Sequence, residues 1–288
     1  MTRGLWRVRA AGEIRLARGD TERGPQDLLG PSVTVASLLA DPGRPLQDLA
    51  WLPASGPVPG QAAILAPLDL QPVWAAGVTF PRSREARREE AVDGGDVYDR
   101  VFSARRPELF VKAAPGAAIG PGEQLGIRAD SDWDVPEPEL GAVAGPDGEL
   151  QALVLGNDMS SRSIEGANPL YLPQAKVYDR SCGIGPCLVP VSAAPPWQQI
   201  RIEMRIVRAG RTLYADEMSM ATMQRTPGEL LRWLLAAQSF PHGVALLTGT
   251  SLVPPGDFTL RDGDVVTVRA DALGALENPV VTVGARQA

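Results

Sequence analysis

Short apolar runs separated by turn residues dominate the chain from about residue 70 onward. Runs of this kind, bounded by Gly, Pro, Asn or Asp, are typical of strands rather than helices. They read ELFVKAA, QLGIRAD, PELGAVAG, LQALVLGND, GPCLVPV, IRIEMRIVRA, VALLTGT, DVVTVRAD and NPVVTVG. One clear helix, PGELLRWLLAAQSF, follows Thr226 as N-cap, with Pro227 as its first residue and Glu229 as capping-box partner. The pattern predicts a mainly β fold with few helices.

The first 72 residues differ from the rest by being small and rich in turns. LWRVRA and EIRLAR predict short strands, and SVTVASLLA and RPLQDLAWL suit a strand or short helices. A new strand, QPVWAAGVTF, opens a second region. We therefore predict a small N-terminal β-rich subdomain over 1–72 and a catalytic domain over 73–288.

A polar segment, PRSREARREEAVDGGDVYDRVFSARR, follows that strand and is too charged to be core. It suits either a solvated helix or a lid over a site, with DGG as a hinge. We expect the 80–100 part of it to order when a ligand binds.

Composition narrows the choice of partners and compartment. The formal net charge is −6 and no basic block stands out, which argues against a nucleic-acid or anionic-membrane partner. The N-terminus has no apolar signal-peptide core and no 18-residue apolar run occurs, so we expect a cytoplasmic protein. Cys182 and Cys187 have neither zinc-knuckle nor CxxC spacing, and we expect two buried thiols.

Lysine is almost absent from the chain. Of 28 basic residues only Lys112 and Lys176 are lysine, and the others are arginine. A lysine ammonium is compact and changes its pKa on burial, whereas a guanidinium is planar and stays charged. The two lysines are candidates for positions where that difference matters, and chance survival of a rare residue is the alternative.

Two glutamates stand two residues apart in SDWDVPEPELG, so Glu137 and Glu139 share one face of a strand. The Asp147-Gly148 turn predicts a hairpin in which Glu137 faces Asp158 and Glu139 faces Gly156. Three clustered carboxylates need a cation, and an all-oxygen set suits Mg²⁺, Mn²⁺ or Ca²⁺. The alternative is a solvated acidic edge that prevents strand aggregation.

The prolines of the same stretch suggest where the strand lies. Pro136 and Pro138 cannot donate to a sheet ladder, so we place this stretch at a sheet edge or rim, where a site can open to solvent.

EPELG, GNDMSSRSIEGANPLYLPQAKVYDRSCGIGP, TGT and GDVVTVRADALGALENPV together resemble the fumarylacetoacetate hydrolase superfamily over about residues 73–288. The resemblance implies a mixed β-sandwich roll, usually dimeric. It implies a divalent metal held by Glu137, Glu139 and Asp158, and it matches Lys176 and Asp179 to the family's KxxD element.

Within the superfamily, RSREAR, VYDRVF, RPELF, WDVPEPE and IEGANPLYLPQAK resemble the 2-keto-3-deoxy-pentonate dehydratases. The hydrolase branch commonly carries NYxxH and a His–Glu dyad that activates water. Here Thr79, Phe80 and Ser83 stand in that segment. The single histidine, His242, lies elsewhere, and we expect it to be structural or at the surface.

The resemblance implies a dehydratase that removes a C3 proton and the C4 hydroxyl of a 2-keto-3-deoxy sugar acid. Lys176 would act as base or fixed cation, with Glu108 and Glu85 as candidates for the second acid/base. Lys112 is either a substrate contact or half of a structural ion pair. Substrate-binding candidates are Arg82, Arg84, Lys112, Arg162, Glu165, Asp179 and Thr250.

Two other functions stay open at this point. One is C–C bond hydrolysis, decarboxylation or isomerisation of an acylpyruvate-like 2-oxo acid, which needs the same metal residues. The other is non-catalytic, metal-dependent binding of a sugar acid.

Overall fold

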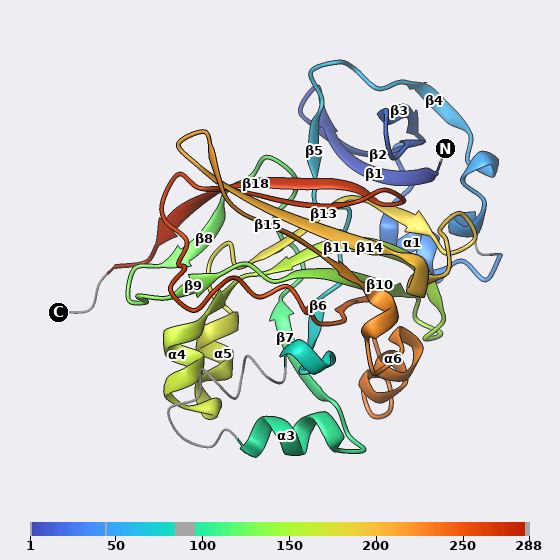
Figure 1. Ribbon diagram of the computed structural model, residues 1–288. Coiled ribbons are helices and arrows are strands. Elements are labelled where there is room, and N and C mark those ends of the chain that lie inside the picture. Colours follow the sequence, from blue (N-terminus) through green and yellow to red (C-terminus); the bar gives the residue numbers. More distant parts are fainter. Residues whose placement is uncertain (1, 44, 84–95, 286–288) are drawn as a thin grey trace.

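The computed structural model describes residues 2–43, 45–83 and 96–285 (Figure 1). The strands are β1 (Arg3–Ala10), β2 (Glu13–Asp20), β3 (Gly24–Leu29), β4 (Ala54–Pro57), β5 (Ala63–Leu65), β6 (Val73–Gly77), β7 (Glu108–Ala113), β8 (Leu125–Arg128), β9 (Asp134–Val135), β10 (Pro138–Ala144), β11 (Leu150–Asp158), β12 (Ser160–Ser161), β13 (Cys182–Pro190), β14 (Arg201–Arg208), β15 (Arg211–Ser219), β16 (Val244–Leu247), β17 (Val265–Ala270) and β18 (Gly274–Val283). The α-helices are α1 (Val35–Ala40), α3 (Asp96–Ser103), α4 (Arg162–Ala167), α5 (Leu172–Lys176) and α6 (Pro227–Leu234). The prediction of a mainly β fold with few helices is confirmed.

Two mixed sheets form the body of the molecule. The larger runs in the order β4-β3-β2-β1-β13-β11-β10-β16-β6-β7, with β5 beside β1, and the smaller in the order β15-β14-β17-β18-β8. Most neighbours are antiparallel, but β16 and β6 are parallel, and so are β18 and β8. In Figure 1 the N-terminal strands lie at the top of the view and α3, α4, α5 and α6 at the bottom.

The main core lies between the two sheets. One buried cluster joins Trp6 of β1 and Leu155 of β11 to Met204 of β14 and Val268 of β17. The other face of the large sheet is covered by separate apolar clusters that include residues of α1 and α6. Alternating burial along β14 is what a strand with one covered and one solvated face requires.

The N-terminal strands extend the same sheet that carries the hairpin of β10 and β11, because β1 pairs with β13. The segment SVTVASLLA forms α1, which Thr34 caps by accepting a hydrogen bond from Ser37 N. The division into 1–72 and 73–288 stays a prediction.

The predicted helix after Thr226 is confirmed at its start and wrong at its end. Thr226 Oγ1 accepts from Glu229 N at 3.1 Å, but the Glu229 carboxyl forms an ion pair with Arg225 at 2.8 Å. The helix ends at Leu234, and the chain then turns so that Phe240 packs edge-on against Trp74.

Three further features can be compared with expectation. Strand β15 was missed because its sequence, RTLYADEMS, is mostly polar and exposed. Cys182 and Cys187 are free and buried, as expected. The polar 80–100 segment falls largely outside the described residues, and α3 forms at its end. No helix within the described ranges is both long and apolar enough to cross a membrane.

Candidate metal centre and active-site pocket

The hairpin of β10 and β11 has the predicted register at the end that carries Glu137, Glu139 and Asp158. Glu139 pairs with Gly156, and Asp158 N donates to Glu137 O at 2.9 Å. Asn157 Oδ1 accepts from Glu137 N at 3.1 Å and holds the backbone there. The two glutamates and Asp158 therefore come from adjacent positions on two paired strands.

Pro138 opens β10 at the rim of the sheet, where β16 no longer accompanies it. Pairing with β16 starts only at Gly141, which faces Leu247. The rim location is thus confirmed, whereas an edge strand is wrong, because β10 lies between β11 and β16. A proline is tolerated here because its missing N–H falls where no ladder partner stands.

The carboxylates of Glu137, Glu139 and Asp158 meet at this rim, with one oxygen of each within 4.8 Å of the others. All three side chains are buried. Glu139 accepts a hydrogen bond from Gly249 N at 2.6 Å, and it has no ion pair with any basic residue in the described chain. Burial, and then the negative charges of Asp158 and Glu137, raise the pKa of the Glu139 carboxyl well above its ordinary value. The site therefore favours an added cation.

Lys176 and Arg162 hold Glu137 from two sides. Lys176 Nζ lies 2.5 Å from Glu137 Oε2, 3.1 Å from Asp158 Oδ2 and 2.5 Å from Ser160 Oγ. Arg162 Nη2 donates to Glu137 Oε1 at 2.8 Å. Helices α4 and α5 supply these two cations, each from a terminal residue.

The other lysine, Lys112, contacts the second carboxylate oxygen of Asp158. Lys112 Nζ lies 2.6 Å from Asp158 Oδ1 and is fully buried. The contact is an ion pair, and its geometry leaves Oδ1 without a satisfied hydrogen bond within the described chain. Such a buried oxygen, in a set of three carboxylates, fits a hard divalent ion that prefers oxygen ligands.

The basic residues at this site contact two of the three carboxylates. Lys112, Lys176 and Arg162 form ion pairs with Glu137 and Asp158, and none of them pairs with Glu139. A divalent cation held here would add positive charge to this group of residues, which would suit an anionic ligand.

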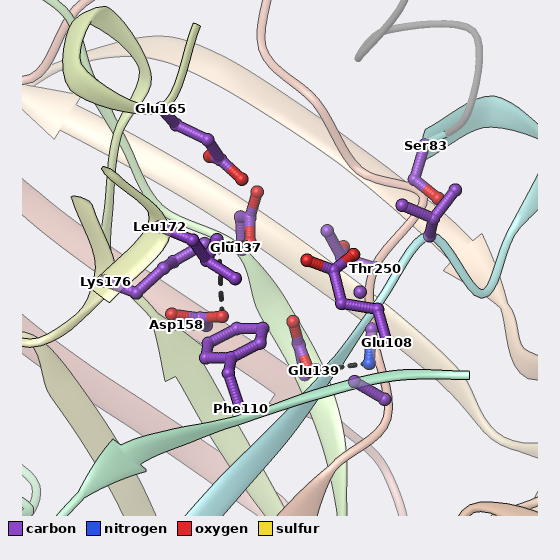
Figure 2. Close-up of a pocket in the computed structure, with 14 residues that line it drawn as sticks. Ser83, Glu108, Phe110, Glu137, Glu139, Asp158, Glu165, Leu172, Lys176 and Thr250 are labelled. Carbon is purple, nitrogen blue, oxygen red and sulfur yellow. Dashed lines mark hydrogen bonds and ion pairs between the residues drawn. The ribbon is translucent and has the colours of Figure 1, made fainter. Parts of the chain in front are cut away.

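A pocket opens above the carboxylates, with an empty volume of about 360 Å³ that includes open solvent (Figure 2). Glu108 and Phe110 enter it from β7, Glu165 from α4 and Leu172 from α5. In Figure 2 the Glu165 carboxyl points toward Glu137. Two carboxyl side chains thus face the cavity beside the three at its floor.

Gly77 allows the Glu108 carboxyl to enter the pocket. A Cβ on Gly77 would lie 2.1 Å from Glu108 Oε2, so any other residue there would displace the carboxyl. The pairing of Gly77 with Glu108 in the β6–β7 ladder sets this close approach.

The predicted site residues are distributed over three places. Glu108, Lys176, Glu165 and Thr250 line the pocket together with the metal-ligand candidates Glu137, Glu139 and Asp158. Lys112 and Arg162 are buried and contact those carboxylates from outside the lining. Arg82 and Asp179 are exposed and outside the lining, and Asp179 lies on the turn after α5 beside a different cavity. Arg84 and Glu85 lie outside the described residues.

Several residues in or beside the pocket escaped the sequence interpretation. Phe110 stands between Glu108 and Lys112 on one face of β7, so strand periodicity could have found it. Its ring centroid lies 5.7 Å from Lys176 Nζ. Ser160 and Gly249 act through contacts that only the folded chain brings together.

Comparison with known proteins agrees with this geometry. A model of the fumarylacetoacetate hydrolase C-terminal region matches residues 83–281. The chain belongs to the fumarylacetoacetate hydrolase family. A probable 2-keto-3-deoxyxylonate dehydratase of Haloferax volcanii is 46% identical over 217 residues, which is 75% of this chain and 74% of that protein. The 2-dehydro-3-deoxy-D-arabinonate dehydratase of Saccharolobus solfataricus is 36% identical over 220 residues, with the same shares covered.

The family's fold extends over the whole chain. A solved structure of 2-keto-3-deoxy-D-arabinonate dehydratase, complexed with magnesium and 2,5-dioxopentanoate, superposes with a TM-score of 0.84 at 29% identity. The match covers 98% of this chain and 99% of that one. The family and fold expected from the sequence are confirmed.

Proposed function

We propose that this chain is a magnesium-dependent dehydratase that converts a 2-keto-3-deoxy-pentonate into 2,5-dioxopentanoate and water. The observation that carries the proposal is the buried carboxylate triplet at the floor of a pocket that also holds a lysine and two further carboxyls. Support comes from a relative with 46% identity that is named as a probable 2-keto-3-deoxyxylonate dehydratase. The matching dehydratase structure, which contains magnesium and 2,5-dioxopentanoate, adds further support.

Glu137, Glu139 and Asp158 would hold the ion. When bound, Mg²⁺ polarises the C2 carbonyl of a 2-oxo acid and stabilises the negative charge that develops there as the C3 proton leaves. The hydroxyl at C4 is β to that carbonyl and departs as water, with one proton supplied by the protein. This elimination leaves a C3–C4 double bond conjugated to the C2 carbonyl, with the alcohol still on C5. Transfer of a proton from C5 to C3 then gives the enol of C4 and C5, which tautomerises to the aldehyde of 2,5-dioxopentanoate, so the net change is the loss of one water.

Lys176 serves as a fixed cation beside the reacting oxygens. Its ammonium has three oxygen partners at 2.5 to 3.1 Å and is buried, so it is already oriented before the substrate arrives. Such an oriented charge stabilises a developing oxyanion without reorganising.

Glu108 is the group that we assign to proton transfer. It reaches the pocket from β7, outside the carboxylates that would hold the ion, and Gly77 leaves room for it. A carboxyl in that position can take the C3 proton or return one to the leaving hydroxyl. Glu85, the other candidate, lies outside the described residues.

C–C bond hydrolysis has less support because it needs an activated water. The chain has one histidine, His242, which is exposed and lines a separate cavity beside Phe240. Where the hydrolase branch carries its histidine motif, Phe80 is fully buried and Thr79 Oγ1 donates to Thr248 O. No imidazole therefore lies in the pocket. The homodimer and the cytoplasmic location stay predictions.

A substrate panel tests the proposal. Purified protein is given 2-keto-3-deoxy-pentonates and acylpyruvates, each with Mg²⁺ and with EDTA, and substrate loss is followed by chromatography. We expect turnover of a pentonate with Mg²⁺ and its loss in EDTA. Faster turnover of an acylpyruvate contradicts the proposal in favour of C–C cleavage, and the absence of turnover of any compound favours the non-catalytic binder.

A further inference from the structure

Lys112 is fully buried, and protein oxygens surround its ammonium. Three oxygens surround Nζ: Asp158 Oδ1 at 2.6 Å, Met159 O at 2.8 Å and Lys176 O at 2.5 Å. The contacts with the two carbonyls are hydrogen bonds, and the contact with Asp158 is an ion pair. Lys112 is also absent from the pocket lining. Of the two roles left open by the sequence, the ion pair fits this geometry and a substrate contact does not.

The three acceptors belong to the two segments that carry the reacting groups. Asp158 ends β11, Met159 follows it directly, and Lys176 ends α5. The last carbonyls of a helix have no hydrogen-bond donor within the helix. Lys112 donates to one of them, the carbonyl of Lys176, whose side chain is the cation in the pocket. One ammonium thus joins the end of a metal-binding strand to the end of a catalytic helix.

Asp158 is held between the only two lysines of the chain. Lys112 takes Oδ1 at 2.6 Å and Lys176 takes Oδ2 at 3.1 Å. The plane and position of this carboxylate are therefore set from both sides. Because Lys112 also holds the backbone of Lys176, a shift of Lys112 would move the ligand and the pocket cation relative to each other.

We propose that Lys112 is a positioning residue that sets the distance between the Lys176 ammonium and the metal-ligand carboxylate of Asp158. Its effect on turnover rests on the proposed function, whereas its effect on ion binding does not. A compact ammonium can meet three converging oxygens in a closed space, but a planar guanidinium directs its donors within one plane. That difference explains why lysine stands here in a chain that otherwise uses arginine almost throughout.

The first test is Lys112→Arg, which keeps the charge and changes the geometry. Mg²⁺ affinity of the folded variant is measured by calorimetry without substrate. We expect binding to weaken by about 10-fold or more, the range found when partners of metal ligands are removed. Val111→Ala, on the opposite and partly exposed face of the same strand, is the control and should bind Mg²⁺ as wild type does. Wild-type Mg²⁺ affinity and turnover in Lys112→Arg would overturn the proposal.

The second test is Lys112→Met, which removes the charge at similar length, with kcat and KM measured on the pentonate. A positioning role predicts that kcat falls about 10- to 100-fold while KM stays within about twofold, because no substrate contact is lost. A raised KM with unchanged kcat would instead show a substrate contact. If both variants fail to fold by circular dichroism, Lys112 is a structural residue and the proposal is wrong. If the wild type does not turn over a pentonate, the proposed function fails, and the calorimetry on Lys112→Arg still decides this inference.

Discussion

Replacing Glu139 by Gln should stabilise the metal-free protein and abolish its response to Mg²⁺. The change keeps the side-chain volume and can keep the hydrogen bond from Gly249 N. It removes one of three carboxylates whose nearest ligand oxygens lie within 4.8 Å. Two such charges repel by about 3 to 4 kcal/mol at an effective dielectric of about 20.

The gain is limited by protonation. The pKa of Glu139 is raised in the folded protein, while the unfolded chain keeps the ordinary value of 4.5. Stability is therefore lost as pH rises above that value, at about 1.4 kcal/mol per pH unit for as long as the folded carboxyl stays protonated. At pH 7 the limit is about 3 kcal/mol, and near pH 4 the difference between Glu and Gln should vanish.

Urea unfolding at pH 7 and pH 4, with EDTA and with Mg²⁺, measures both effects. In EDTA at pH 7 we expect the free energy of unfolding of Glu139→Gln to be about 1 to 3 kcal/mol higher than that of wild type. The gain is smaller than the full repulsion because nearby Lys176 offsets part of it. Saturating Mg²⁺ should stabilise wild type by about 2.7 kcal/mol at 100 times its Kd and leave the variant unchanged. Glu149→Gln, an exposed change in the loop of the same hairpin, is the control. An equal Mg²⁺ response in Glu139→Gln, or a loss of stability in EDTA, would refute the reasoning.

Three further substitutions test other parts of the account. Burial raises the pKa of Asp134 to about 6 from an unfolded value of 3.8, so its carboxylate destabilises the fold progressively as pH rises through that range. Asp134→Asn should therefore gain up to about 3 kcal/mol above pH 6 and little near pH 4, and a pH-independent difference in urea unfolding would count against this. Gly77→Ala should displace the Glu108 carboxyl and lower kcat about 10-fold or more with Mg²⁺ affinity kept, whereas unchanged kinetics would remove Glu108 from proton transfer. Lys176→Arg should lose most of kcat with Mg²⁺ affinity little reduced, and a near-wild-type enzyme would show that charge alone suffices there.

The cluster of three carboxylates could be predicted because strand geometry alone brings them together. The side-chain period of two puts Glu137 and Glu139 on one face, and an antiparallel hairpin returns Asp158 to them. The predicted pairing next to the loop was wrong. Gly145 N donates to Glu149 O, so Ala144 pairs with Leu150, whereas the predicted register pairs it with Gln151.

A β-bulge corrects the register farther along the hairpin. Gln151 is the extra residue, because Val143 pairs with Ala152, and from there the pairs run as expected to Glu139 and Gly156. The Gln151 side chain donates to Leu39 O at 2.9 Å, a contact between segments far apart in the sequence. Such a bulge depends on packing against the N-terminal region, which a local pattern cannot reveal.

The second wall of the pocket could not be derived from local patterns. Strand β7 reaches the site through the order β10-β16-β6-β7, which joins segments far apart in the chain. Rarity drew attention to Lys112 and Lys176, yet only the fold shows that both hold Asp158. Likewise, Arg162 and Glu165 were predicted as site residues, but the direction in which each side chain points is set by α4. This helix is too short to predict from periodicity.

The central claim is dehydration of a 2-keto-3-deoxy-pentonate, and the identity of the product tests it most directly. The purified chain is incubated with the pentonate and Mg²⁺, and the mixture is followed by proton NMR until the substrate is consumed. The account predicts 2,5-dioxopentanoate, recognised by its aldehyde signal, in an amount equal to the substrate lost, and no reaction in EDTA. Formation of pyruvate and glycolaldehyde, which together contain all the atoms of the substrate, would show cleavage between C3 and C4 and contradict the account.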